Sequence, residues 1–162
     1  MKSLTNLEKY YLIAILCCYL LLQGCSFNSG HARYVDIVIK ASHYINPSDN
    51  QEASPVFVKI YQLSDYGNFQ MANFLDLYQN KADVALGNQL VHLQPPVSIR
   101  PGDVWRKRIE LEPQARYIGF LVQFRHYEDR VHRQWLEIKE RGSQCIQLGI
   151  SGLNLSLNNR CK

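Results

Sequence analysis

Residues 116–125 read Arg-Tyr-Ile-Gly-Phe-Leu-Val-Gln-Phe-Arg, and this stretch decides the fold class. Four alternate positions in it carry large apolar side chains: Ile118, Phe120, Val122 and Phe124. A period of two is the pattern of a β-strand, because successive side chains of a strand point to opposite faces of a sheet. The stretch is therefore predicted to be a strand with one wholly apolar face against a core.

The same period of two recurs through most of the remaining chain. It is found in residues 35–41, 56–61, 105–111, 136–138, 146–150 and 153–157. Either 90–93 or 97–99 adds a further strand, which makes about eight short strands separated by turn residues. Such a series indicates a two-sheet sandwich or a barrel. The predicted fold class is therefore all-β.

The pattern changes between Leu63 and Gly87. Phe74, Leu77 and Tyr78 stand at positions i, i+3 and i+4, which is helical spacing. Residues 84–86 precede Gly87, and glycine commonly ends a helix. We expect short helices here that form a lid over one open end of the sandwich. A ligand pocket beneath this lid is an alternative interpretation.

The N-terminus has the order of a bacterial lipoprotein signal peptide. A start with Lys2 and Lys9 is followed by the apolar run 10–22, and then by Leu22-Gln23-Gly24-Cys25. The apolar run is shorter than the roughly 20 residues that a membrane-spanning helix needs. Leu-x-Gly-Cys resembles the lipobox that a lipoprotein signal peptidase reads. An uncleaved anchor with a chance cysteine is the alternative.

Processing at this motif would divide the chain into three parts. Residues 1–24 are the predicted signal peptide, 25–33 the lipidated Cys25 with its tether, and 34–162 a periplasmic β-sandwich domain. Several acyl chains on one cysteine hold a protein stably on a membrane. Residue 26 is Ser rather than Asp, which by the usual bacterial sorting rule indicates the outer membrane.

Five cysteines occur in the sequence, and most have an assignment. Cys17 and Cys18 leave with the signal peptide, and Cys25 carries the lipid. Cys145 and Cys161 remain in the predicted domain, where an oxidising compartment favours a disulfide between them. Two separate thiols are the alternative.

Charge and motifs argue against nucleic-acid binding and catalysis. The formal net charge is +4, and Lys2, Glu8 and Lys9 contribute +1 of it, which leaves +3 for the mature part. That is too little for a nucleic-acid footprint. The sequence contains no His-Glu-x-x-His, no Gly-x-Ser-x-Gly and no glycine-rich phosphate loop before a helix. We therefore predict no catalytic residue, no metal site, no small-molecule substrate and no cofactor beyond the lipid on Cys25.

A set of short motifs follows in a fixed order. They are Asn46-Pro47, Ser54-Pro55-Val56, Tyr61-Gln62-Leu63, Phe69, Phe74, Leu77-Tyr78, Leu86-Gly87, Ile99-Arg100-Pro101-Gly102, Arg116-Tyr117-Ile118-Gly119 and Phe124-Arg125. In this order, and behind a lipobox, they resemble the outer-membrane lipoprotein of the type VI secretion system, the TssJ (SciN, VasD) family. The resemblance runs from about residue 35 to at least residue 138.

The resemblance implies a transthyretin-like β-sandwich with short helices added between the second and third strands. It also implies a role, because members of this family hold the periplasmic C-terminal domain of the inner-membrane protein TssM. With TssL these proteins form a membrane complex that crosses the envelope. The loop between the first two strands, residues 43–54 here, is the part implicated in gripping TssM.

Within that loop, nine residues are the predicted partner-binding site: Tyr44, Ile45, Asn46, Pro47, Ser48, Asp49, Asn50, Gln51 and Glu52. Its polar sequence predicts a flexible middle. Tyr44 and Ile45 are expected to anchor in a partner pocket, with Asp49 and Glu52 at the rim. In the alternative interpretation, Ile45 tucks under the sandwich.

Three other functions remain open at this point. One is a pilotin-like or other assembly lipoprotein of a different envelope machine, and another is a ligand-binding periplasmic lipoprotein. The third is an enzyme, because transthyretin-like folds include a ureide hydrolase. That hydrolase ends in Tyr-Arg-Gly-Ser, whereas residues 158–162 here are Asn-Asn-Arg-Cys-Lys. We therefore expect a protein that is not an enzyme.

Overall fold

The computed structural model describes residues 10–11, 32–79, 81–126, 132–139, 142 and 144–161 of the 162-residue chain. The chain divides into two compact units, residues 1–31 and 32–162. Of the first unit only Tyr10 and Tyr11 are described, and both are helical. The rest of the predicted signal peptide, Cys25 and most of the tether lie outside the described residues. The second unit holds the strands and is described by itself below.

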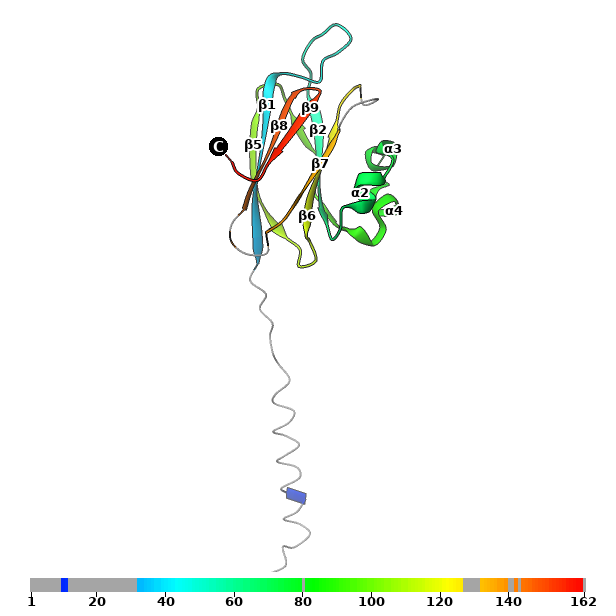
Figure 1. Ribbon diagram of the computed structural model, residues 1–162, viewed down its shortest axis with the longest axis vertical. Helices are drawn as coiled ribbons and strands as arrows, with labels where there is room; N and C mark the ends of the chain where they lie inside the picture. The colour runs from blue at the N-terminus through cyan, green and yellow to red at the C-terminus, as the bar shows by residue number, and fades with distance from the viewer. Residues whose placement is uncertain are drawn as a thin grey trace, which may run out of the picture. The chain divides into compact units, whose positions relative to one another are not determined.

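The second unit is built mainly of strands, with three short helices beside them (Figure 1). The strands are β1 (Arg33–Ile45), β2 (Val56–Leu63), β3 (Leu90–Leu93), β4 (Val97–Ile99), β5 (Val104–Leu111), β6 (Tyr117–Gln123), β7 (Arg133–Glu137), β8 (Gln144–Gly152) and β9 (Asn154–Asn158). The helices are α2 (Gly67–Met71), α3 (Phe74–Tyr78) and α4 (Ala82–Leu86), followed by the 3-10 turn η1 (Gly87–Gln89). The prediction of an all-β sandwich with helices between the second and third strands is confirmed.

Two sheets face each other. The first has the order β5-β1-β8-β9, and the second has the order β3-β2-β6-β7 with β4 also paired to β2. β1 and β8 run parallel, whereas the other pairs are antiparallel. This order brings the N-terminal strand β1 into the middle of the first sheet, between β5 and β8.

Both candidates for the additional strand are strands. β4 pairs with Val56–Val58 of β2, and β3 pairs with Tyr61–Leu63 of the same strand. Pro95 and Pro96 lie between them and cannot donate backbone hydrogen bonds to a ladder. The expected count was therefore one too low, because a pair of prolines divides one edge of the sheet into two strands.

The main core lies between the two sheets. Ile118, Phe120 and Val122 of β6 are completely buried there, in agreement with the apolar face seen in the sequence. Ile37 and Ile39 of β1 and residues of β8 complete it from the first sheet. Burial of this continuous apolar layer is the main stabilising contribution to the sandwich.

A second core lies on the outer face of the second sheet. Tyr61 and Leu63 of β2 and Leu121 of β6 pack there against side chains from the helices, chiefly Phe69, Phe74, Leu77, Ala82 and Leu86. Figure 1 shows the three helices beside β2, β6 and β7. The expectation of a lid over an open end is therefore wrong, because β2 and β6 are apolar on both faces and their outer face requires a cover.

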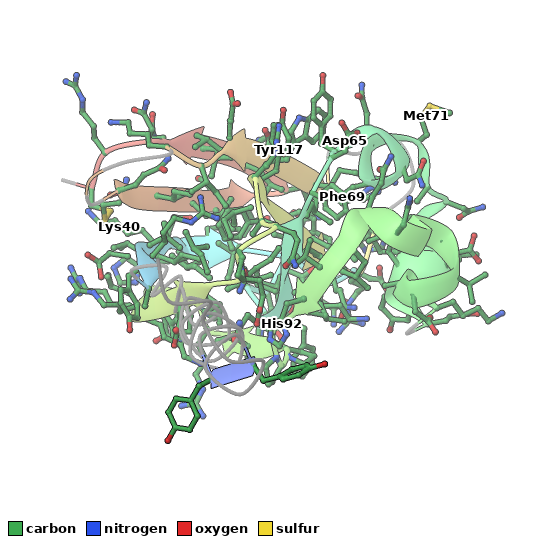
Figure 2. The ribbon with its side chains drawn as sticks, turned by 90° about the horizontal axis from the view of Figure 1, so that it is seen from below. Lys40, Asp65, Phe69, Met71, His92 and Tyr117 are labelled. Atoms are coloured by element: carbon green, nitrogen blue, oxygen red, sulfur yellow. A yellow bond between two sulfur atoms is a disulfide. The ribbon has the colours of Figure 1, made fainter. Side chains whose placement is uncertain are left out.

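Phe69 fills the space between α2 and the sheet. Its side chain is completely buried, whereas Met71 in the same helix is 85% exposed and points away into solvent (Figure 2). A Cβ at Gly119 would lie 3.0 Å from Cε1 of Phe69, so β6 carries glycine where the ring approaches its backbone. Phe69, Leu77 and Leu86 are all fully buried. Their side chains fill the space beneath the helices, where a ligand pocket was the alternative interpretation.

Candidate functional site

The loop between β1 and β2 lies at the far end of β1 from Arg33, where the folded unit begins (Figure 1). β1 contains 13 residues, so at a rise of about 3.3 Å per residue it separates its two ends by about 40 Å. The loop is accompanied at this end by the β4–β5 turn, the start of the β6–β7 connection and the β8–β9 turn. Four connections therefore meet at one end of the sandwich.

The structure separates the nine predicted partner-binding residues into three groups, which are buried, half-buried and exposed. Ile45 is completely buried in the main core and Asn46 is only 5% exposed. Tyr44 is 46% exposed, and Asp49, Asn50, Gln51 and Glu52 are exposed. Pro47 and Ser48 are half-buried. Of the two interpretations of Ile45, the structure therefore supports the one in which its side chain tucks under the sandwich.

The middle of the loop is a closed turn. Ser48 N donates to Glu52 O at 2.8 Å, and Gln51 N donates to Ser48 O at 2.9 Å. The Glu52 N–H also donates to the Ser48 hydroxyl at 3.2 Å, and the Tyr44 hydroxyl donates to Gln51 Oε1 at 2.8 Å. The loop is therefore tied together by local hydrogen bonds, and it is more ordered than its polar sequence predicts.

Asn46 joins the loop to two other connections. Its Nδ2 donates to Ser54 Oγ at 3.0 Å and to Pro55 O at 2.8 Å. Its Oδ1 accepts the backbone N–H of Arg125 at 2.7 Å, and its own backbone N–H donates to Gly152 O at 2.9 Å. With a φ of 46°, its backbone is left-handed, a conformation that asparagine tolerates better than most residues. Asn46 therefore links the β1–β2 loop to the β6–β7 and β8–β9 connections.

A second contact between the loop and the β6–β7 connection lies on the surface. His126 Nε2 is 3.1 Å from Asp49 Oδ1, and the two side chains are 51% and 80% exposed. Such a pair carries full opposite charges only when His126 is protonated, and at this exposure it contributes little to stability. The pair shows that Asp49 and His126 lie next to each other on the surface.

The β4–β5 turn closes against β1 at the same end. Gly102 N donates to Ser42 O at 3.0 Å, and the φ of Gly102 is 81°, which favours glycine. A Cβ at this position would lie 2.8 Å from Nδ1 of His43. The ring of His43 therefore packs against Gly102 of this turn.

The C-terminal segment is fastened on the first sheet. Cys145 of β8 and Cys161 form a disulfide, with Cα atoms 5.6 Å apart. Nearby on the outer face of this sheet, Arg108 donates two hydrogen bonds of 2.8 and 3.0 Å to Asp36, its cross-strand neighbour. The hydrogen bonds from Arg108 hold the pKa of Asp36 below its usual range. These contacts lie on the sheet face and not at the loop end.

The described part of the chain gives two further observations about metal binding and membrane spans. No group of three His, Cys, Asp or Glu side chains there is placed to hold a metal ion. No described helix has the length and apolar character that a membrane span requires.

The sequence interpretation placed the partner-binding surface in the β1–β2 loop alone. It does not assign Arg125, His126 or Gly152 to this surface, because they are remote from the loop in the chain and come near it only through strand pairing. The available signal was Asn46-Pro47 directly after a strand, since an asparagine side chain at a strand end commonly bonds neighbouring backbone.

A family model and a solved structure both match type VI secretion lipoproteins. A family model described as type VI secretion lipoprotein, VasD, EvfM, TssJ, matches residues 33–153. The solved structure of the lipoprotein TssJ1 from Pseudomonas aeruginosa is 25% identical with a TM-score of 0.75, and the match covers 81% of this chain and 98% of that one. No match is found among curated proteins.

Two further structures share the fold. Serratia marcescens Lip, a membrane-bound component of the type VI secretion system, is 22% identical with a TM-score of 0.66 over 76% of this chain and 96% of that chain. A chain from a structure described as the TssM C-terminal domain (869-1107) from EAEC is 21% identical with a TM-score of 0.62. That match covers 77% of this chain and 97% of the other.

Proposed function

This chain belongs to the type VI secretion lipoprotein family, and from that we propose that it anchors the periplasmic C-terminal domain of TssM at the outer membrane. A lipid on Cys25 would hold the chain on the membrane, and TssL would join the same complex. The role is one of binding and needs no catalytic residue, so we propose that the protein is not an enzyme.

The observation that carries this proposal is the position of the β1–β2 loop in the folded unit. The chain enters β1 at Arg33, and the loop lies at the other end of that strand. A tether of residues 26–32 would reach roughly 25 Å when extended. A lipid anchor on Cys25 would therefore hold the Arg33 end near the membrane, which leaves the loop end free to meet a partner that comes from the inner membrane.

The chemistry of the loop end is consistent with a protein partner. Tyr44 offers an exposed aromatic ring fixed by its bond to Gln51, and Asp49 and Glu52 offer charge around it. Aromatic anchors with a polar rim are typical of protein interfaces. A chain of the same fold, 24% identical, occurs in a structure described as the type VI membrane complex, which supports a partner within that complex. The family resemblance implies that this partner is TssM.

Calorimetry with residues 26–162 and the periplasmic C-terminal fragment of TssM tests the proposal. We expect a measurable complex with the wild-type domain. Replacing residues 47–52 by a Gly/Ser linker keeps Ile45 and Asn46, and changes in such loops cost little stability. Affinity should fall at least tenfold, about 1.4 kcal/mol. Absence of binding by a correctly folded wild-type domain would contradict the proposed function.

A further inference from the structure

We propose that Asn46 is the positioning residue of a composite partner surface, made of the β1–β2 loop together with Arg125 and His126 at the start of the β6–β7 connection. The proposal rests on the proposed function, since the partner is the same TssM domain. It goes further in assigning a role to residues outside the loop and to a residue that the partner does not touch.

The hydrogen bonds of Asn46 hold several segments of the chain together. One buried side chain donates to Ser54 Oγ and Pro55 O and accepts from Arg125 N, while its backbone N–H is held by Gly152 O. A buried polar group whose bonds are all made fixes the relative positions of its partners, because leaving any of them unmade is costly. The β1–β2 loop and Arg125 are therefore held in one arrangement.

Exposed residues of both connections lie next to one another at this end of the sandwich. Arg125 and His126 are exposed, and His126 lies 3.1 Å from Asp49 across the boundary between the two connections. Tyr44 and Glu52 are exposed on the loop side of this boundary. A protein that binds Tyr44 and Asp49 thus also meets His126. The fitting partner is a surface with an apolar recess for one aromatic ring and polar groups of both signs around it.

Position 46 requires two side-chain donors, one side-chain acceptor and a left-handed backbone, and asparagine supplies all of them. Aspartate keeps the acceptor for Arg125 N but loses both Nδ2 donors. Glycine keeps the left-handed backbone but loses every side-chain bond. The variants Asn46→Asp and Asn46→Gly therefore remove different parts of the same network and should differ in effect.

Gln62 supplies a matched control at the opposite end of the sandwich. It is also a buried amide, 1% exposed, and it also joins two elements. Its Nε2 donates to Glu110 O at 2.9 Å, and its Oε1 accepts from Glu112 N at 2.8 Å. Gln62→Ala thus removes a comparable set of buried bonds near the start of β1, far from the loop. It reports the effect of destabilisation alone.

The experiment measures TssM-fragment affinity, thermal stability and amide hydrogen exchange for each variant of the 26–162 domain. We expect Asn46→Gly to lower affinity at least tenfold and to speed exchange of the Arg125 amide. Asn46→Asp should protect the Arg125 amide from exchange better than Asn46→Gly does, since it keeps that acceptor. Gln62→Ala should bind within twofold of wild type although its melting temperature falls. Arg125→Ala and His126→Ala, which are surface changes that leave the fold intact, should each weaken binding at least threefold.

The outcomes separate this inference from the proposed function. Wild-type affinity in Asn46→Gly, or an equal loss in Gln62→Ala, would overturn the role of Asn46. If Asn46→Gly does not fold, Arg125→Ala and His126→Ala decide, and unchanged affinity in both would overturn the composite surface. A wild-type domain that does not bind the TssM fragment at all would instead overturn the proposed function.

Discussion

Lys59 donates from Nζ to the backbone carbonyl oxygen of Leu77 at 2.8 Å, and to that of Tyr78 at 3.0 Å. Carbonyl groups in the last turn of a helix have no partner within the helix, so this lysine of β2 caps α3. Arg133 of β7 caps α2 in the same way, with Nη1 2.6 Å from Phe69 O and 2.8 Å from Ala72 O. Two cations of the second sheet thus fasten two helices to it.

These caps matter because each helix has only five residues. Isolated helices of this length do not form in water, because the nucleation cost exceeds what so few hydrogen bonds return. Burial of Phe69, Leu77 and Leu86 against the sheet supplies the missing free energy, and the caps satisfy carbonyl groups that this burial removes from water. The helices therefore depend on the sheet for their existence.

Replacing Lys59 by methionine should destabilise the domain. Lys59 is 3% exposed, and its loss leaves the buried carbonyl of Leu77 without this donor. An unsatisfied buried acceptor costs about 1–3 kcal/mol. Urea denaturation should show a lower midpoint for Lys59→Met, whereas Lys107→Met, at an exposed position on β5, should match wild type. An unchanged midpoint for Lys59→Met would contradict the capping role.

The contribution of Lys59 should also depend on pH. Burial lowers the pKa of Lys59 below its ordinary value, because desolvation disfavours the charged form. Between the lowered folded pKa and the unfolded value of about 10.4, the unfolded chain binds more protons, so stability from this group rises with pH. The difference in unfolding free energy between wild type and Lys59→Met should therefore grow from pH 7 to pH 10. A constant or shrinking difference would contradict this sign.

Cys161→Ser should lower the melting temperature without abolishing the fold. The disulfide to Cys145 spans a sequence separation of 16 and fastens the segment after β9 to β8. A loop of that length contributes roughly 3 kcal/mol in the chain-entropy account. Calorimetric melting of both proteins measures the difference, and non-reducing peptide mapping of the native protein should recover the linked pair. Recovery of two alkylatable thiols from the native protein would contradict the pairing of Cys145 with Cys161.

Cys25→Ser should abolish lipid attachment. The lipobox-like Leu22-Gln23-Gly24-Cys25 motivates this prediction, and residue 25 lies outside the described part of the structure. The wild-type mature protein should carry acyl groups on residue 25 in mass spectrometry and should fractionate with the outer membrane. The variant should remain as a precursor that no longer does so. A wild-type N-terminus at another residue, with no lipid mass, would show that the motif is not used.

Tyr44→Ala should weaken TssM binding more than Asp49→Ala does. Tyr44 presents an aromatic ring held by Gln51, whereas Asp49 is a solvent-exposed charge next to His126. Buried aromatic anchors outweigh rim charges at interfaces, and the difference should reach at least tenfold in Kd. Calorimetry at two salt concentrations measures it, and salt should weaken wild-type binding only modestly. A larger loss of affinity in Asp49→Ala than in Tyr44→Ala would contradict the prediction and indicate that charge dominates the binding.

Much of the fold could be predicted from local patterns, and the errors share one cause. Alternation in 116–125 correctly indicates a strand with Ile118, Phe120 and Val122 inside. The same stretch contains Leu121 on the opposite face, which is equally buried. A period of two shows that a strand has two faces, but it does not show what covers each of them. For this reason the sequence alone predicts a lid at an open end, whereas the helices cover the second sheet.

The sequence by itself determined the strands and the family resemblance, because alternation and short motifs can be read along the chain. The resemblance also gave the segment in which a partner site is expected. Only the tertiary structure decided that Ile45 belongs to the core and that Asn46 binds Arg125, 79 residues further along the chain. The two residues meet because β1 and β6 lie in opposite sheets whose ends coincide. Contacts of that kind depend on how whole strands pair and stack, and no short stretch of sequence encodes them.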